Sequence, residues 1–281
     1  MERILSISTA AFDGYDLPVA IEEIGRLGVA YVEPAFIQGY TEEFGEEIFS
    51  ASSARRVQAM MDAAGVSCFA LSAHLNLTVP GAVEIFKKRM GFARSLGAEV
   101  IVSNAGLKKD EEIFLKNMEV LAREAEILDL VIGLENPGDG RENIINTGQD
   151  GAPLIKRLGS KWIRLNYDFG NLLSHRFEKV RPEEDYLYAL PVSVHLHLKD
   201  VKGLVEGWGF TEIGKGAIDY ARIFKGMARE SSPLPASLEI PLRFTRGPDA
   251  LPRRGAAPFP LEEIRRVLKR SLDFVKSHLD V

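Results

Sequence analysis

Acidic and imidazole side chains stand where successive apolar runs of this sequence end. Four of them follow one another in chain order, and they are Glu135, Asp168, His197 and Glu239. Three carboxylates and one imidazole form a donor set that suits Mn²⁺, Mg²⁺, Co²⁺, Fe²⁺ or Zn²⁺ without selecting one of them. No thiolate is present to favour a structural zinc site. Because neighbouring buried carboxylates need a cation or protons, the pattern predicts a metal centre if these run ends meet in space.

The segment 194–200 reads VHLHLKD and gives the clearest of these signals. If it is a strand, His195, His197 and Lys199 share one face, because side chains alternate along a strand. An inert core would avoid two imidazoles and an ammonium on its inward face. The segment therefore favours His197 as a metal ligand.

The other three predicted ligands each have an ordinary alternative. Glu135 could face solvent, Asp168 could shape a turn, and Glu239 could form a salt bridge. Their occurrence in order at successive run ends is what favours the metal interpretation. His175, in a predicted loop, and His278, in the predicted terminal helix, are interpreted as surface residues.

Eight short apolar runs alternate with segments of helical periodicity along the chain. The predicted strands cover 4–8, 29–33, 66–71, 99–103, 130–135, 161–167, 192–199 and 236–240. The predicted helices cover 16–27, 52–64, 80–97, 110–128, part of 140–159, 183–190, 218–229 and 260–278. This alternation predicts an α/β fold, a single (β/α)₈ barrel of parallel strands that spans residues 1–281 as one domain. A doubly wound sheet would need a glycine-rich phosphate turn after its first strand, and 9–14 is not one.

The predicted barrel positions the polar run ends, because the active site of such a barrel lies where the strands end. Several further polar residues near these ends are candidate substrate contacts: His74, Asn104, Lys199, Asp200, Trp208 and Arg243. Arg246 stands beside Arg243 in the segment 241–258, which is rich in Pro, Gly and Arg and is predicted to be a long functional loop. Either arginine could meet an anionic substrate or form surface ion pairs.

Composition narrows the class of protein further. A formal net charge of −5 lacks the clustered basic charge that nucleic-acid binding requires. The one cysteine, Cys68, excludes an intrachain disulfide and reads as a small core residue. No apolar run suggests a signal peptide or approaches the roughly 20 residues of a membrane span. We expect a cytoplasmic protein with a small-molecule substrate and neither nucleic-acid nor membrane partners.

Several segments together resemble a known family over nearly the whole chain. They are LGVAYVE (27–33), LGAEV (96–100), GLEN (133–136), YDFGN (167–171), HLHLKD (195–200), GKGAIDY (214–220) and SLE (237–239). They are similar to the xylose isomerase-like barrels, which include sugar isomerases, epimerases and related enzymes. The resemblance implies that Glu135, Asp168, His197 and Glu239 hold one divalent metal. It also implies that Glu135 and Glu239 move protons on opposite faces of the substrate, and that the chain forms homo-oligomers.

Two positions depart from the epimerases of this family. Asn171 stands where many relatives carry a histidine, and Gly203 stands near the place where an arginine is frequent. Both departures weaken any transfer of the epimerases' substrate contacts to this chain.

The resemblance implies an isomerase or epimerase of a sugar or related polyhydroxy carbonyl compound. Such an enzyme would act by proton transfer through a metal-stabilised enediolate. A lyase or dehydratase of a keto-sugar or keto-inositol shares the first step and is the alternative. A phosphoesterase like endonuclease IV would need several metals and a basic face, against which the five histidines and the negative charge speak. A non-enzymatic partner subunit would have no reason to keep all four ligands.

Overall fold

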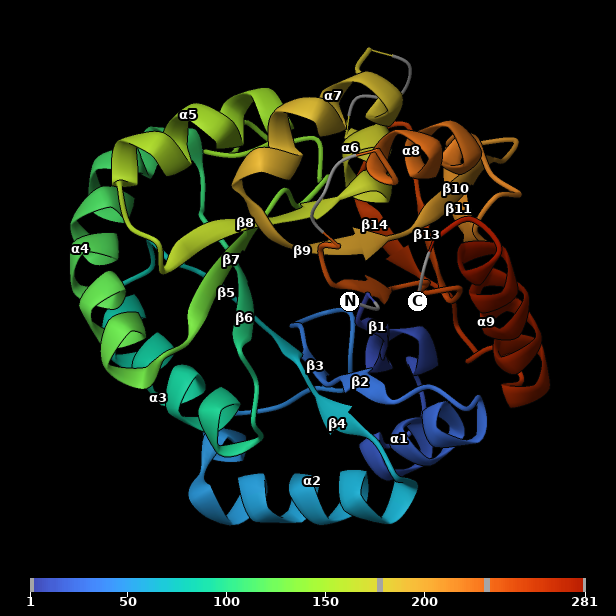
Figure 1. Ribbon diagram of the computed structural model, residues 1–281, viewed down its shortest axis with the longest axis horizontal. Helices are drawn as coiled ribbons and strands as arrows, with labels where there is room; N and C mark the ends of the chain where they lie inside the picture. The colour runs from blue at the N-terminus through green and yellow to red at the C-terminus, as the bar shows by residue number, and fades with distance from the viewer. Residues whose placement is uncertain (1–2, 176–178, 230–232, 280–281) are drawn as a thin grey trace.

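Parallel strands form a barrel wall in the computed structural model, which describes residues 3–175, 179–229 and 233–279 (Figure 1). The strands pair in the order β3-β5-β6-β7-β8-β9-β12-β1-β2-β4, and every pairing in this sheet is parallel. Their bounds are β1 Leu5–Ser8, β2 Tyr31–Glu33, β3 Ala35–Phe36, β4 Ser67–Cys68, β5 Ala70–Asn76, β6 Val100–Asn104, β7 Val131–Glu135, β8 Ile163–Asp168, β9 Ser193–Leu198 and β12 Ala236–Leu238.

The ten strands occupy eight barrel positions, because two positions are each split into two strands. Pro34 separates β2 from β3, and its missing N–H interrupts the ladder there. Phe69 separates β4 from β5 in the neighbouring position. Since β2 pairs with β4 and β3 pairs with β5, the sheet closes on itself. The predicted α/β barrel is confirmed.

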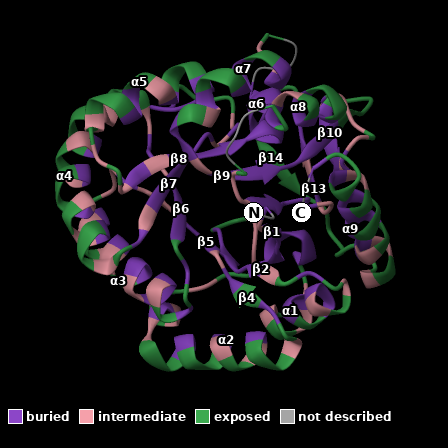
Figure 2. Cartoon of the chain, viewed as in Figure 1, coloured by how far each residue is buried: buried purple, intermediate pink, exposed green. Residues whose placement is uncertain are grey.

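Helices surround the strands, and the strands themselves are almost entirely buried (Figures 1 and 2). The helices are α1 Leu17–Arg26, α2 Ala51–Ala64, α3 Ala82–Ser95, α4 Glu111–Leu128, α5 Gly148–Leu158, α6 Phe169–His175, α7 Pro182–Ala189, α8 Tyr220–Met227 and α9 Leu261–Lys276. Fully buried side chains such as Ile21, Met90 and Leu121 lie on the inner faces of the helices. Apolar burial between helices and strands is the main stabilising contribution to this fold. No helix within these described ranges is both long enough and apolar enough to cross a membrane.

Local sequence signals explain where individual helices begin and end. The Ser50 side chain accepts a hydrogen bond from the Ser53 N–H at the start of α2, and Gly65 ends the helix with a φ of +68°. Helix α6 differs from the prediction, because the chain turns directly from β8 into a helix whose residues are all buried. His175 at its end is therefore a buried residue, and its predicted surface position is wrong. Its Nδ1 accepts a hydrogen bond from the Gly140 N–H at 3.1 Å.

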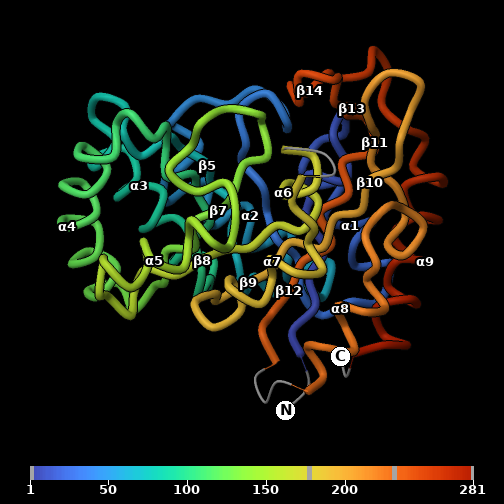
Figure 3. The backbone as a smooth tube through the Cα atoms, turned by 90° about the horizontal axis from the view of Figure 1, so that it is seen from above, coloured from blue at the N-terminus to red at the C-terminus, as the bar shows by residue number. Residues whose placement is uncertain are grey.

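A second, antiparallel sheet forms from the segments that follow β9 and β12. Its order is β10-β11-β13-β14, with β10 Asp200–Gly203, β11 Trp208–Thr211, β13 Phe244–Arg246 and β14 Pro252–Arg254. Seen from above, β13 and β14 lie at the opposite end of the molecule from the two termini (Figure 3). The segment predicted as a long loop, 241–258, thus contributes two strands. These strands are too short for periodicity to reveal them, and β13 joins the sheet by pairing with β11, which is distant in sequence.

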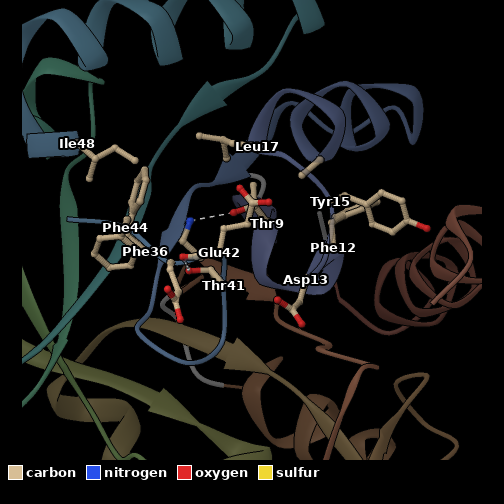
Figure 4. Close-up of a pocket in the computed structure, with 13 residues that line it drawn as sticks. Thr9, Phe12, Asp13, Tyr15, Leu17, Phe36, Thr41, Glu42, Phe44 and Ile48 are labelled. Carbon is tan, nitrogen blue, oxygen red and sulfur yellow. Dashed lines mark hydrogen bonds between the residues drawn. The ribbon is translucent and has the colours of Figure 1, made fainter. Parts of the chain in front are cut away.

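Asp13, near the start of the chain, forms ion pairs with arginines in and beside this second sheet. It follows the 3₁₀ helix η1 (Thr9–Phe12) and is buried. Its carboxylate accepts hydrogen bonds from Arg243 Nη1 at 3.2 Å and from Arg254 Nε at 3.0 Å. Arg254 Nη2 also donates to the Thr41 carbonyl at 2.8 Å. Asp13 and Thr41 line a small, mostly apolar cavity of about 100 Å³ that contains none of the predicted metal ligands (Figure 4).

We predict that Arg254→Ala loosens the segment 241–258, whereas Arg253→Ala does not. Arg254 binds a buried carboxylate, and its loss should cost about 1–3 kcal/mol of unfolding free energy because Asp13 loses a charged partner. Arg253 forms an exposed ion pair with Asp249, and such pairs contribute little. Hydrogen exchange of residues 241–258 and the thermal midpoint measure both effects. Equal hydrogen exchange and equal thermal midpoints in the two variants would show that the contact between Arg254 and Asp13 does not hold this segment in place.

Candidate metal centre

The four predicted metal ligands come together at the ends of adjacent barrel strands. Parallel register aligns these ends, since Asp168 pairs with His197 and Ser237 pairs with the same histidine, two residues before Glu239. Glu135 ends β7, next to β8. One candidate ligand atom of each of the four lies within 4.8 Å of those of the others. All four side chains are buried.

The ligand atoms face a common point around the imidazole of His197. His197 Nδ1 lies 3.1 Å from Glu239 Oε2, 3.2 Å from Glu135 Oε2 and 3.7 Å from Asp168 Oδ2. Within the described residues, His197 Nδ1 has no hydrogen-bond partner, and outside the cluster only the Lys199 ammonium lies close to Asp168 Oδ2 and Glu239 Oε2. Buried polar atoms of this kind normally have one. Three carboxylate oxygens and one imidazole nitrogen that converge in this way form a donor set that suits a divalent cation.

Asparagine side chains hold the carboxylates in place. Asn166 Nδ2 donates to Glu135 Oε2 at 2.9 Å, and Asn171 Nδ2 donates to Glu135 Oε1 at 2.8 Å. The Asn171 N–H donates to Asp168 Oδ1 at 2.7 Å. Asn171, one of the two departures from the related epimerases, therefore connects two of the clustered carboxylates. This role depends on the turn from β8 into α6, which the sequence pattern did not reveal.

Glu33 orients His197 from the side opposite the cluster. His197 Nε2 lies 3.0 Å from Glu33 Oε1, and the Ser72 hydroxyl donates to the same oxygen at 2.6 Å. Burial would raise the pKa of Glu33, but His197 and His195 outweigh it and lower the pKa to about 2. An anionic Glu33 can only accept, so His197 donates its Nε2–H and Nδ1 is the nitrogen that faces the cluster. Burial would lower the pKa of His197, but Glu33 and Glu239 outweigh it and raise the pKa well above its usual value, so a metal that binds Nδ1 would displace a proton there. The sequence placed Glu33 at a strand end, but this pairing was not predicted.

A second acidic and imidazole group shares His197 with the first, and its ligand atoms are already hydrogen-bonded. It consists of Glu33, His195 and His197. His195 Nδ1 bonds with Asn166 Oδ1 at 2.7 Å, and His195 Nε2 bonds with the Ser237 hydroxyl at 3.0 Å. Burial lowers the pKa of His195 to about 4, so its ring is neutral. Because both of its nitrogens are already used, this group serves as support for His197.

Lys199 places a positive charge directly beside the cluster. Its Nζ lies 2.8 Å from Asp168 Oδ2 and 2.6 Å from Glu239 Oε2. Burial would lower the pKa of Lys199, but Asp168 and Glu239 outweigh it and raise the pKa above its usual value. The ammonium therefore neutralises two of the oxygens that a metal would use.

We predict that Lys199→Met strengthens metal binding and destabilises the metal-free protein. Removing the ammonium leaves Asp168 and Glu239 buried without a cation, which should cost about 3–5 kcal/mol of unfolding free energy in the metal-free state. The rise in thermal midpoint on adding metal should therefore be larger than in the wild type. Lys202→Met, at an exposed position of β10, is the matched control. An unchanged metal-dependent rise in Lys199→Met would show that the ammonium does not compete with the metal.

A cavity of about 480 Å³ opens above the cluster. Of the four clustered residues, Glu135 and Glu239 line it, whereas Asp168 and His197 lie deeper. The predicted substrate contacts on its wall are His74, Asn104 and Lys199. Burial lowers the pKa of His74, whose Nε2 lies 3.4 Å from Glu135 Oε2. Arg246, which the sequence offered beside Arg243 as a contact for an anionic substrate, also lines the wall. Further polar residues of the wall that were not among the predicted contacts are Gln38, Tyr40, Asn76, Asp139, Arg141 and Asn171.

Three predicted substrate contacts lie away from this cavity. The Asp200 carboxylate accepts hydrogen bonds from four backbone N–H groups between residues 201 and 218, and burial raises its pKa to about 6. Trp208 is buried on β11, opposite Gly203 and Arg246 in the second sheet. Arg243 binds Asp13 and the carbonyls of 255 and 256. The reason is that the chain turns after Lys199 into β10, so residues adjacent in sequence to the cluster leave the barrel mouth.

Comparison with known proteins gives one family and several similar folds. The family model described as xylose isomerase-like TIM barrel matches residues 21–271. A sequence search among curated proteins finds no match. Among solved structures, D-psicose 3-epimerase from Clostridium cellulolyticum H10 has a TM-score of 0.75 at 18% identity, with 100% of both chains covered.

Two other solved structures with this fold are those of enzymes whose names indicate different reactions. The 3-keto-D-glucoside 4-epimerase of E. coli has a TM-score of 0.70 at 14% identity, covering 98% of this chain and 100% of that one. The probable 3-DHS dehydratase of Bacillus anthracis has a TM-score of 0.67 at 13% identity, covering 97% and 98%. At these identities the likeness concerns the fold.

Proposed function

The chain belongs to the xylose isomerase-like TIM barrel family, and we propose that it is a divalent-metal-dependent isomerase or epimerase of a sugar or related polyhydroxy carbonyl compound. One observation carries this proposal. Of the four residues that cluster as metal ligands, Glu135 and Glu239 also line the cavity, whereas Asp168 and His197 do not. Two glutamates that face both a cation site and a substrate cavity suit proton transfer next to a carbonyl group.

The four clustered residues would hold the metal. When bound, a divalent metal supplies positive charge that polarises a carbonyl oxygen and acidifies the neighbouring C–H. Glu135 and Glu239 lie on β7 and after β12, with β8 and β9 between them in the barrel wall. They therefore approach the cavity from different directions. One carboxylate removes the proton, and the other returns a proton from its own side.

Neutral donors on the wall would orient the sugar hydroxyls. His74 is uncharged at neutral pH, since burial lowers its pKa, and it lies next to Glu135. Asn104, at the end of β6, lines the same wall. These two residues keep the role of substrate contacts that the sequence suggested.

Lys199 supports a second candidate function, a lyase or dehydratase reaction of a keto-sugar or keto-inositol. After removal of a proton, such a reaction needs an acid for the departing hydroxyl. The Lys199 ammonium lines the cavity and lies 2.6 Å from Glu239 Oε2. The ammonium would therefore hydrogen-bond to the departing hydroxyl, which would leave as water with the proton that the neighbouring carboxylate has removed.

Proton exchange tests the proposal and separates the two candidates. The protein would be loaded singly with Mn²⁺, Mg²⁺, Co²⁺ or Zn²⁺, Mn²⁺ first, and incubated in D₂O with ketoses and keto-polyols. Deuterium incorporation next to the carbonyl, with formation of an isomer or epimer, is the expected result. Loss of water with a new conjugated carbonyl absorbance would favour the dehydratase. Absence of exchange with every metal, in protein that binds the metal, would refute the proton-transfer function.

A further inference from the structure

Arg246 is a cation of the cavity wall that lacks an anionic partner. Three cationic side chains line the cavity, namely Arg141, Lys199 and Arg246. Lys199 is ion-paired with two carboxylates of the cluster, and Arg141 Nε lies 3.8 Å from Asp139 Oδ2. In the part of the chain that the structure describes, no carboxylate lies within ion-pair distance of Arg246. A buried charge is costly unless it is paired, so this arginine requires an explanation.

Neutral oxygens alone hold the Arg246 guanidinium. The residue is only 2% exposed. Nη1 donates to the carbonyls of Gly138 at 2.7 Å and Ala250 at 3.0 Å. Nη2 has only long contacts of 3.4 Å, to the Pro137 carbonyl and to Asn171 Oδ1, and Nε has no partner among the described residues. The group is thus fixed in orientation by Nη1, while its remaining donors are poorly satisfied.

Tyr40 adds a second unused donor on the same wall. Its ring stacks on Phe244 with centroids 4.5 Å apart, and Phe244 is two residues before Arg246 on β13. Because alternate residues of a strand share a face, the stacked ring lies on the same side of β13 as the guanidinium. Within the described ranges, the Tyr40 hydroxyl has no hydrogen-bond partner, and the residue lines the cavity.

Asn171 connects this wall to the proposed proton-transfer site. Its Nδ2 donates to Glu135, and its Oδ1 lies 3.4 Å from both Lys199 Nζ and Arg246 Nη2. One small side chain therefore separates the guanidinium from the glutamate. A single substrate can contact both, with its carbonyl end at the cluster and its other end at Arg246.

We propose that Arg246, assisted by Tyr40, binds a carboxylate of the substrate, so that the substrate class is a polyhydroxy keto acid and not a neutral ketose. This inference rests on the proposed function, because it concerns the same cavity. A guanidinium binds a carboxylate through strong charge-assisted hydrogen bonds, and the long contacts of Nη2 would leave this nitrogen for that purpose. The carboxylate also supplies the missing negative charge.

Matched acid and neutral ligands test this substrate class. L-Sorbose and 5-keto-D-gluconate differ in having a hydroxymethyl group or a carboxylate at one end, and further ketose and keto-acid pairs extend the comparison. Binding to the metal-loaded protein would be measured by calorimetry and thermal shift. We expect the acid to bind about tenfold or more tightly than its neutral counterpart, and malonate to compete with it. Arg246→Met should abolish the preference, Arg246→Lys should retain part of it, and Arg141→Met should leave it unchanged.

The outcomes separate this inference from the proposed function. If no pair shows a preference for the acid in the wild type, or if Arg246→Met keeps the preference, the carboxylate site is refuted. Because the wild-type comparison and the malonate competition need no variant, poor folding of Arg246→Met does not prevent a decision. Proton exchange with neutral ketoses alone would refute the keto-acid class and leave the isomerase function standing. Tight, Arg246-dependent binding of acids without proton exchange would support the carboxylate site and refute the isomerase function.

Discussion

Glu239→Gln and Glu135→Gln are each expected to reduce turnover by about 10²–10⁴-fold, the range that a positioned acid or base contributes. The substitution keeps the size of the side chain and removes its ability to carry a proton. Both glutamates line the cavity and both belong to the ligand cluster. Each substitution can therefore reduce turnover in two ways, by removing a proton-transfer group and by weakening metal binding. Metal content must be measured alongside activity.

Proton exchange distinguishes the loss of proton transfer from the loss of metal binding. If each glutamate serves one face of the substrate, each variant that still binds metal should exchange the proton of only one epimer. Glu262→Gln, at an exposed position of α9, is the control and should match the wild type. Unchanged turnover and unchanged metal content in either variant would refute the assignment of that glutamate.

The grouping of the four clustered side chains was predictable, because it depends on regular features of the chain. Apolar runs with alternating side chains predict the strands, and parallel strands bring their ends to one edge. Glu135, Asp168 and His197 follow that rule directly, and Glu239 comes directly after β12. No detail of packing is needed to bring such residues together. This is why the sequence alone indicated both the barrel and the cluster.

Residues that support the cluster could not be predicted in the same way. Glu33 contacts His197 across 164 residues, and Arg246 approaches Asn171 across 75. Such contacts depend on the exact path of the chain after each strand. The same limit explains Asp200 and Arg243, which stand near site residues in sequence but bind backbone groups and Asp13 instead. Local pattern determines the strand ends, whereas tertiary packing determines which loop side chains reach them.

Glu33→Gln is expected to weaken metal binding by about 10–100-fold, the usual effect of losing a carboxylate that orients a ligating histidine. The anionic Glu33 holds the Nε2–H of His197, so that Nδ1 faces the cluster. Glutamine can present its amide N–H to Nε2 instead. This contact would favour the tautomer that carries its proton on Nδ1, which cannot bind a metal. His197→Ala removes the ligand itself, and we expect it to lose stoichiometric metal altogether.

Metal content after dialysis, together with titration against a chelator, measures both variants. Glu23→Gln is the matched control, because Glu23 is also a buried glutamate but pairs with Arg26 and Arg265 on the outside of the barrel. It should lower stability without changing metal affinity. If Glu33→Gln bound metal as tightly as the wild type, the Nε2 contact would not be what orients His197. If His197→Ala kept one metal per chain, the cluster would not be the metal site, and the proton-transfer function would lose its cation.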